Sequence, residues 1–300
     1  MIAGRRILLL GHRGLVGHEL VRCLSPYGRM VTSGRNSGDH PADLSDPASV
    51  DALLASSRPD IIVNAAAYTA VDLAEDHADE ANRVNRDLPA RLAEFAVENG
   101  ALLVHFSTDY VFNGSNRRPY VETDPTDPIG VYGSSKLAGE LAIHQSGCRH
   151  LIFRTSWVYA NGGQSFVTKI LARAATVKEL KIVDDQYGTP TWSRTLAQLT
   201  TAAVERSEGI GSGVFHLSST GQPVSWRGFA VEMLSLCRQR LPESPDVIPV
   251  ATGEFPTRAQ RPAYSALDNS LFQEKFGLRV PDWRQQLQWC LEDFRPFPHP

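Results

Sequence analysis

Two side chains in this sequence, Tyr132 and Lys136, stand at a spacing that can support proton transfer. Positions i and i+4 of a helix lie on one face, and an ammonium group beside a phenol lowers the pKa of the phenol. Such a phenol can act as an acid near neutral pH. The alternative is a partly exposed helix face without chemistry, so the pair gains meaning only from reactive neighbours.

A hydroxyl group, that of Thr108, is expected beside this pair. Residues 102–107 form an apolar run typical of a buried strand, and Thr108 and Asp109 follow close behind. Side chains at the carboxyl ends of parallel strands gather at the edge of the sheet where ligands bind. Thr108, Tyr132 and Lys136 are therefore predicted to be catalytic residues: a hydroxyl, a phenol and an ammonium that together resemble the set with which short-chain dehydrogenases reduce a carbonyl. The alternative for Thr108 is a strand-end hydroxyl that bonds to the backbone.

A glycine-rich turn near the start of the chain is predicted to bind a dinucleotide. It follows the apolar run of residues 7–10 and opens a helical pattern over 14–24. Glycines there let the backbone approach a pyrophosphate, and the helix N-terminus supplies amides and a positive dipole end. The alternative is an ordinary strand–helix turn. The residues predicted to contact the cofactor here are Gly11, Arg13, Gly14, Leu15, Val16 and Gly17.

The end of the second strand favours NADPH over NADH as the cofactor. NAD sites usually place a carboxylate there for the ribose 2′-hydroxyl, but Ser33 is followed by Gly34 and Arg35. Arg35, with Arg13 as a second cation, could bind a 2′-phosphate. The alternative is that both arginines are solvated surface groups. Further predicted cofactor contacts are Asp43 and Leu44 near the adenine, and the small residues Ala65, Ala66 and Ala67 after the next strand.

Strand and helix patterns alternate through the first half of the chain. Strands are predicted over 7–10, 29–33, 61–64, 102–107 and 151–155, and helices over 14–24, 47–56, 78–99 and 132–145. This alternation, with nearly continuous apolar strands, predicts an α/β fold with a doubly wound parallel sheet of the Rossmann type. Residues 1–160, with part of 190–220, should bind the cofactor, and 161–300 should form most of a smaller C-terminal substrate lobe. In that lobe, helices are expected over 166–176, 193–206 and 226–239, a strand over 214–218, and a loop over 242–262.

Composition excludes several classes of function. A formal net charge of −3 without a basic cluster argues against nucleic acid and acidic membrane surfaces as partners. The four cysteines are far apart, which argues against a disulfide framework or structural zinc. His12, His105 and His216 lack other ligands at metal-binding spacing, so we interpret them as structural or surface residues and predict no metal site. No apolar stretch reaches membrane-spanning length, and a cytoplasmic protein is expected.

Longer motifs spread over most of the chain resemble one family. They occupy residues 64–72, 106–114, 132–140, 153–159, 185–191 and 261–262. In this order they resemble the dTDP-4-dehydrorhamnose reductases, which are extended short-chain dehydrogenases/reductases.

The resemblance implies reduction of dTDP-4-dehydro-β-L-rhamnose to dTDP-β-L-rhamnose. Tyr132 matches the proton donor of the family, and Lys136 matches the residue that holds the nicotinamide ribose. Thr108 matches the hydroxyl that polarises the ketone. The residues implied to contact the sugar nucleotide are Thr69, Val71, Thr108, Asp109, Trp157 and, as a diphosphate ligand, Arg261. Trp157 as a pocket-wall aromatic and Arg261 as a packing residue remain alternatives.

The sequence departs from the family at a position that affects assembly. Some family members form dimers through magnesium held by glutamates; Glu19 matches one such ligand, but Arg194 stands at another. A cation cannot bind magnesium, so we expect a monomer or a metal-free homodimer. Two rival functions remain: a 4-ketoreductase for a different nucleotide-linked deoxysugar, and a non-catalytic regulatory subunit that keeps the dinucleotide site.

Overall fold

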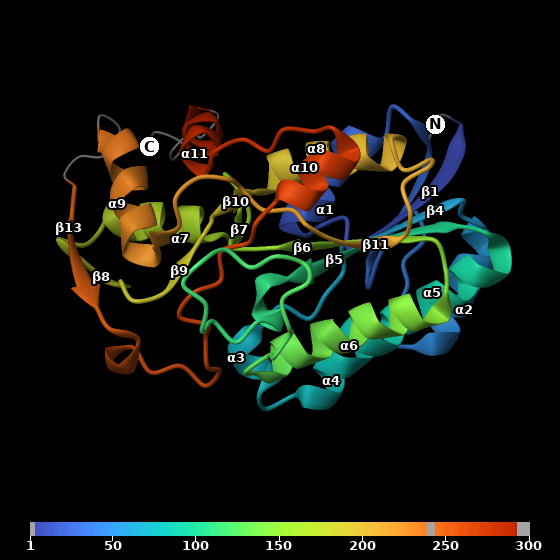
Figure 1. The fold of residues 1–300 in the computed structure, drawn as a ribbon, viewed down its shortest axis with the longest axis horizontal. Helices are drawn as coiled ribbons and strands as arrows, with labels where there is room; N and C mark the ends of the chain where they lie inside the picture. Colours follow the sequence, from blue (N-terminus) through green and yellow to red (C-terminus); the bar gives the residue numbers. More distant parts are fainter. Residues whose placement is uncertain (1–3, 239–243, 293–300) are drawn as a thin grey trace.

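The central element of the computed structural model, which describes residues 4–238 and 244–292, is a sheet of seven strands (Figure 1). Their order is β11-β6-β5-β4-β1-β2-β3, and all neighbours are parallel except β2 and β3. The strands are β1 (Arg5–Leu10), β2 (Gly28–Gly34), β3 (Ser37–Gly38), β4 (Ile61–Asn64), β5 (Leu102–Thr108), β6 (His150–Thr155) and β11 (Gly213–His216). The order reverses between β1 and β4, where α/β sheets form a ligand crevice. The predicted doubly wound fold is confirmed.

Helices cover both faces of this sheet because its central strands are apolar on both sides. Side chains such as Leu9 point to one face and those such as Leu10 to the other. The first face carries α1 (Leu15–Leu24), α8 (Ser193–Glu205) and α10 (Ser270–Phe276). The second carries α2 (Pro47–Ser57), α5 (Leu88–Asn99) and α6 (Val131–Ser146).

A second group of elements lies beside the sheet, at the left of Figure 1, and has its own apolar core. Its helices are α7 (Phe166–Ala174), α9 (Trp226–Leu236) and α11 (Trp283–Glu292). Its strands form three short pairs: β8 (Glu179–Val183) with β13 (Asp246–Val250), β7 (Val158–Tyr159) with β10 (Thr191–Trp192), and β9 (Tyr187–Gly188) with β12 (Val224–Ser225). The division into residues 1–160 plus part of 190–220 and a substrate lobe stays a prediction.

Two expected segments differ in the structure. The predicted loop over 242–262 contains β13, which pairs in parallel with β8, and a 3₁₀ turn at Thr252–Glu254; residues 242 and 243 lie outside the described part. The end of the helix expected over 226–239 is also outside it. The single helix expected over 78–99 is α4 (Ala78–Asn82), a π-helical turn at Arg83–Asp87 and α5.

The π-helical turn has a cause in the sequence. Pro89 has no N–H to donate to the carbonyl of Asn85, so the normal i→i−4 bond cannot form there. The Leu88 N–H bonds instead to the carbonyl of Arg83. The Asn85 carbonyl lies against α6 where Gly139 leaves room, since a Cβ at Gly139 would come within 2.1 Å of that oxygen. Among the described helices, none is both long and apolar enough to cross a membrane.

Candidate active site

A cleft of about 800 Å³ opens at the carboxyl ends of the parallel strands. Every residue predicted to be catalytic lines it, as do all but three of the predicted cofactor and substrate contacts; the exceptions are Gly17, Val71 and Arg261. Lining residues without a predicted role are Gly34, Ser45, Tyr68, Val84, Phe106, Ser107, Thr155, Val158, Gly163 and Gln164. The fold thus gathers side chains from five strand ends around one space.

The glycine turn shapes one end of the cleft. Gly11 has φ +78°, and a Cβ there would lie 2.7 Å from the backbone of Ala65 and Ala66, so only glycine fits. Helix α1 begins immediately afterwards, and its N-cap residue, Gly14, offers no side chain to the first amides. Unsatisfied amides at a helix N-terminus form a site for an anion such as a pyrophosphate. Gly17 lies behind the turn, where a Cβ would be 2.1 Å from the Gly11 carbonyl oxygen.

Cationic groups lie at the same end. Arg13 and Arg35 both line the cleft, and the Arg35 side chain is 71% exposed with its Nε 3.8 Å from Asp43. Hydrogen bonds from Ser45, helped by Arg35, lower the pKa of Asp43. The nearby carboxylate of Asp39 accepts bonds from the Thr32 backbone and hydroxyl and is not among the lining residues.

Two buried hydroxyl groups of the cleft lack hydrogen-bond partners, as expected where a ligand would supply them. The hydroxyls of Ser107 and Thr155 are enclosed and make no hydrogen bond in the described structure. Buried hydroxyls are normally paired, because an unpaired one costs about 1–3 kcal/mol. The glycine turn, the open helix terminus and these hydroxyls together suit a polar ligand of dinucleotide size.

Thr108, Asp109 and Tyr132 form the reactive centre of the cleft. The Thr108 hydroxyl donates to Asp109 at 3.0 Å and accepts from the Tyr110 N–H at 3.2 Å. Burial raises the pKa of Asp109 to about 7, although hydrogen bonds from Ser265 and Thr108 act in the opposite direction. Burial also raises the pKa of Tyr132 to about 12, while hydrogen bonding to Thr108 lowers it. Tyr132 therefore holds its proton at neutral pH.

The pKa of Tyr132 is raised, whereas the spacing of Tyr132 to Lys136 predicts a lowered pKa. The Lys136 side chain is buried, and its Nζ is occupied by the Phe106 carbonyl at 2.6 Å and His105 Nε2 at 3.1 Å. Burial lowers the pKa of Lys136 to about 8, and the Glu140 carboxylate opposes that change. Lys136 and Tyr132 stand one helical turn apart, and removal of the phenol from water is the largest influence on the pKa of Tyr132.

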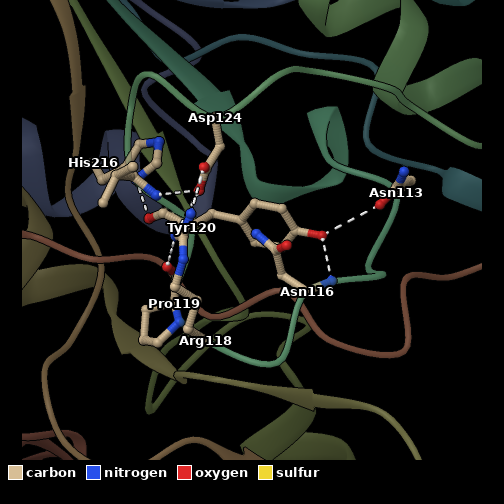
Figure 2. Close-up of polar contacts among 8 residues, drawn as sticks. Asn113, Asn116, Arg118, Pro119, Tyr120, Asp124 and His216 are labelled. Atoms are coloured by element: carbon tan, nitrogen blue, oxygen red, sulfur yellow. Dashed lines mark hydrogen bonds and ion pairs between the residues drawn. The ribbon is translucent and has the colours of Figure 1, made fainter.

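The loop between Thr108 and α6 is fixed by a polar cluster shown in Figure 2. The Tyr120 carbonyl lies 3.0 Å from His216 Nδ1 on β11, and the Tyr120 hydroxyl donates to Asn113. Arg118 and Asp124 pair within the loop at 2.7 Å. The cluster ties the loop that leads into α6 to the last strand of the sheet, which helps to position Tyr132.

A second support comes from the π-helical turn. The buried Asn85 side chain accepts from the Tyr68 N–H at 2.9 Å and donates to the Ser135 hydroxyl at 3.0 Å. It therefore joins the chain after β4 to the helix that carries Tyr132. Asn85 escaped prediction, because its contacts depend on a helix irregularity. The proline four residues later was the available signal.

Trp157 forms a rigid wall of the cleft. Its backbone is left-handed, with φ +46°, a conformation rare for bulky residues and common at functional sites. Its ring stacks on Trp226 with centroids 3.5 Å apart and planes 2° apart. Gly188 is needed beside it, because a Cβ there would lie 2.6 Å from the indole. This geometry suits both a pocket wall and a direct ligand contact.

Arg261 and Val71 are not among the residues that line the cleft. The Arg261 guanidinium pairs with Asp72 at 2.8 Å, and this bond is the largest cause that lowers the pKa of Asp72. Val71 is the first residue of the short helix α3 (Val71–Ala74). Through this ion pair, Arg261 joins the C-terminal segment to α3.

Glu19 and Arg194, the two positions compared with magnesium ligands of the family, form an ion pair with each other. Arg194 Nε lies 3.3 Å from Glu19 Oε2, and Arg22 lies 3.6 Å from the other oxygen. Over residues 4–238 and 244–292, no cluster of three or more His, Cys, Asp or Glu side chains could hold a metal ion.

Comparisons with known proteins give the family of the chain. Residues 5–295 match the family model described as the RmlD substrate binding domain. The chain is 43% identical to a dTDP-4-dehydrorhamnose reductase of Burkholderia thailandensis, with 96% of this chain and 98% of the relative aligned. It is 41% identical to the reductase of Escherichia coli, over 96% and 97% of the two chains.

Solved structures of dTDP-4-dehydrorhamnose reductases also resemble this chain. A dTDP-4-dehydrorhamnose reductase of Bacillus anthracis, solved in complex with NADP, superimposes with a TM-score of 0.89 at 31% identity, over 97% of this chain and 99% of that one. The ortholog from Clostridium acetobutylicum gives a TM-score of 0.88 at 32% identity, over 95% and 98%. The chain belongs to the dTDP-4-dehydrorhamnose reductase family of oxidoreductases.

Proposed function

We propose that this protein reduces dTDP-4-dehydro-β-L-rhamnose to dTDP-β-L-rhamnose with NADPH. The observation that carries the proposal is the convergence of Thr108, Tyr132 and Lys136 at one cleft that also contains the glycine turn. Full-length similarity to reductases named for this substrate supports it.

Each side chain has a distinct role in the proposed reaction. When bound, NADPH supplies the hydride that reduces the sugar ketone at C-4. Tyr132, which is protonated at neutral pH, donates its proton to the ketone oxygen. The Thr108 hydroxyl exchanges its bond to Asp109 for a hydrogen bond donated to the same oxygen, which gains charge only in the transition state. Lys136 holds the nicotinamide ribose.

The remaining predicted contacts divide between the two ligands. Gly11, Gly14, Leu15 and Val16 hold the pyrophosphate, and Asp43, Leu44, Ala65, Ala66 and Ala67 enclose the adenosine half. Thr69, Asp109 and Trp157 contact the sugar nucleotide. Gly17 supports the turn from behind, and Arg261 acts by packing, because its ion pair with Asp72 holds the guanidinium. Val71 begins helix α3 outside the lining of the cleft.

A turnover assay tests the proposal. Purified dTDP-4-dehydro-β-L-rhamnose should oxidise NADPH in the presence of the protein, and NMR of the product should show the L-rhamnose configuration at C-4. Turnover with another nucleotide-linked 4-keto sugar but not with this one would support the rival ketoreductase. Tight NADPH binding without turnover of any such sugar would identify a regulatory subunit.

The preference for NADPH rests on Arg35, with Arg13 as a second cation. Arg35→Ala should lower kcat/KM for NADPH about 10- to 150-fold, since a charged hydrogen bond is worth about 1.5–3 kcal/mol, and should leave the value for NADH unchanged. Arg29→Ala is the matched control, because Arg29 is an exposed arginine on β2, the strand that precedes Arg35, and lies outside the cleft. An equal loss with both cofactors would contradict a 2′-phosphate contact.

Assembly follows from the Glu19–Arg194 pair. Because Arg194 already neutralises Glu19, we propose a monomer or a homodimer that needs no metal. We also propose a cytoplasmic location for the reaction. Sedimentation should give the same mass with EDTA or magnesium present. A dimer that EDTA dissociates would refute this assembly.

A further inference from the structure

Three buried polar side chains lie in a row beneath the reactive centre. Asn64 and His105 are neighbours on the parallel strands β4 and β5, and Lys136 reaches them from α6. Asn64 and His105 have no exposed surface, and Lys136 is 2% exposed. Asn64 Nδ2 lies 3.1 Å from His105 Nδ1, and His105 Nε2 lies 3.1 Å from Lys136 Nζ.

The direction of the first hydrogen bond is fixed by the backbone. The Ala66 N–H donates to Asn64 Oδ1 at 3.2 Å, and a backbone N–H can only donate. The amide oxygen of Asn64 must therefore face Ala66, which leaves its NH₂ group facing His105. His105 Nδ1 accepts from that group, so it carries no proton.

The second bond follows from the first. Burial and the nearby lysine hold the pKa of His105 well below its ordinary value, so the imidazole is neutral. A neutral imidazole carries one proton, and here it must be on Nε2. The Nε2–H then points at Lys136 Nζ, which itself donates to the Phe106 carbonyl.

An N–H donor opposite Lys136 suits only one form of the lysine. An amine has a lone pair that can accept this bond, whereas an ammonium has none. Tyr132 on α6 and Asp109 after β5 line the same cleft as Lys136, and Glu140 on α6 acts on the lysine electrostatically. Glu140 would favour the ammonium but is paired with Arg154 on β6 at 2.6 Å. To receive an ammonium, His105 must move its proton to Nδ1, where it meets the NH₂ of Asn64.

We propose that the chain of hydrogen bonds from Ala66 through Asn64 and His105 stabilises the amine form of Lys136. His105 is then a positioning residue that sets the proton occupancy of the cofactor-binding lysine. This inference rests on the proposed function for its relevance to turnover. The inference extends that function, because side chains of β4 and β5 would then control the protonation of Lys136.

The small number of lysines allows a direct test. Lys136 is buried, while the other four, Lys169, Lys178, Lys181 and Lys275, are exposed. Protein labelled with ¹³C at lysine Cε gives five resonances, and Lys136→Met identifies the one that disappears. In the wild-type protein the Lys136 midpoint should lie at least about one pH unit below the other four. Imidazole ¹⁵N shifts should show the His105 proton on Nε2.

One substitution distinguishes the chain of hydrogen bonds from burial as the cause of the lowered Lys136 midpoint. Asn64→Leu removes the donor to His105 Nδ1 without changing charge, so His105 can offer a lone pair to an ammonium. The Lys136 midpoint should rise by about one pH unit, a tenfold change in proton affinity. Asn269→Leu, at another buried asparagine that bonds Ser218, is the matched control and should leave the midpoint unchanged.

The outcomes are decisive. A His105 proton on Nδ1 in the wild-type protein, or an unchanged Lys136 midpoint in Asn64→Leu, would overturn the proposal. If Asn64→Leu does not fold, the wild-type tautomer alone decides. All these readouts are independent of turnover, so absence of reductase activity would count against the proposed function and leave this inference standing.

Discussion

Tyr132→Phe is expected to lower kcat by about 10²–10⁴-fold, the usual contribution of a positioned general acid. The substitution removes only the hydroxyl that would donate to the ketone oxygen. The ring can keep its edge-on packing with Tyr110, 5.8 Å away between centroids. NADPH affinity, measured by fluorescence titration, should stay within a few-fold of the wild-type value, because the phosphate-binding turn is untouched.

The control for this experiment is Tyr110→Phe. Tyr110 is also a partly buried tyrosine, but it is outside the cleft lining, and its hydroxyl bonds to Arg261. This variant should keep most of the turnover. Wild-type rates in Tyr132→Phe would mean that another group supplies the proton, and Asp109, whose pKa is raised to about 7, would be the first candidate.

Arg154→Met should be the most destabilising single change at this edge of the sheet. The Arg154 Nε and NH₂ groups both bond to Glu140 at 2.6–3.2 Å, and both side chains are nearly inaccessible. Removal of the arginine leaves a buried carboxylate without its partner, which costs about 3–5 kcal/mol. Arg154 also packs over the Phe112 ring at 5.2 Å. Urea denaturation should show the loss as a lower midpoint.

A double variant distinguishes the unpaired charge from lost packing. Glu140→Leu combined with Arg154→Met removes both charges and fills the space with apolar groups. Replacement of a buried pair in this way is often neutral, so the double variant should regain most of the stability lost in Arg154→Met. A double variant as unstable as the single one would assign the effect to packing against Phe112.

The sequence predicted the parts of this structure that local patterns control. Strand β5 is a continuous apolar run, and Thr108 follows from its end. The glycine turn, Tyr132 and Lys136 lie on elements whose order along the chain determines where they meet. For the same reason the family motifs fall at one sheet edge.

Features that depend on contacts between distant segments were not predictable. Strand β13 contains Pro249 and pairs with β8 through a long connection, so the region resembled a loop. His105 was interpreted as structural or surface because no spacing rule connects a strand residue with Lys136 on a later helix. The pKa of Tyr132 was expected in the wrong direction, since burial is a property of the whole fold.

The path of the chain between the sheet and the lobe also affects biosynthesis. Phe272 and Phe276 of α10 belong to the same apolar cluster as Ile7 and Leu9 of the first strand. During translation, the face of the sheet that α10 covers stays open until residue 276 has left the ribosome. Chains of this kind expose apolar surface while they wait for late segments, which favours aggregation. A ribosome-arrested nascent chain stopped before α10 should therefore recruit chaperones, and the protein released from the ribosome should not bind them.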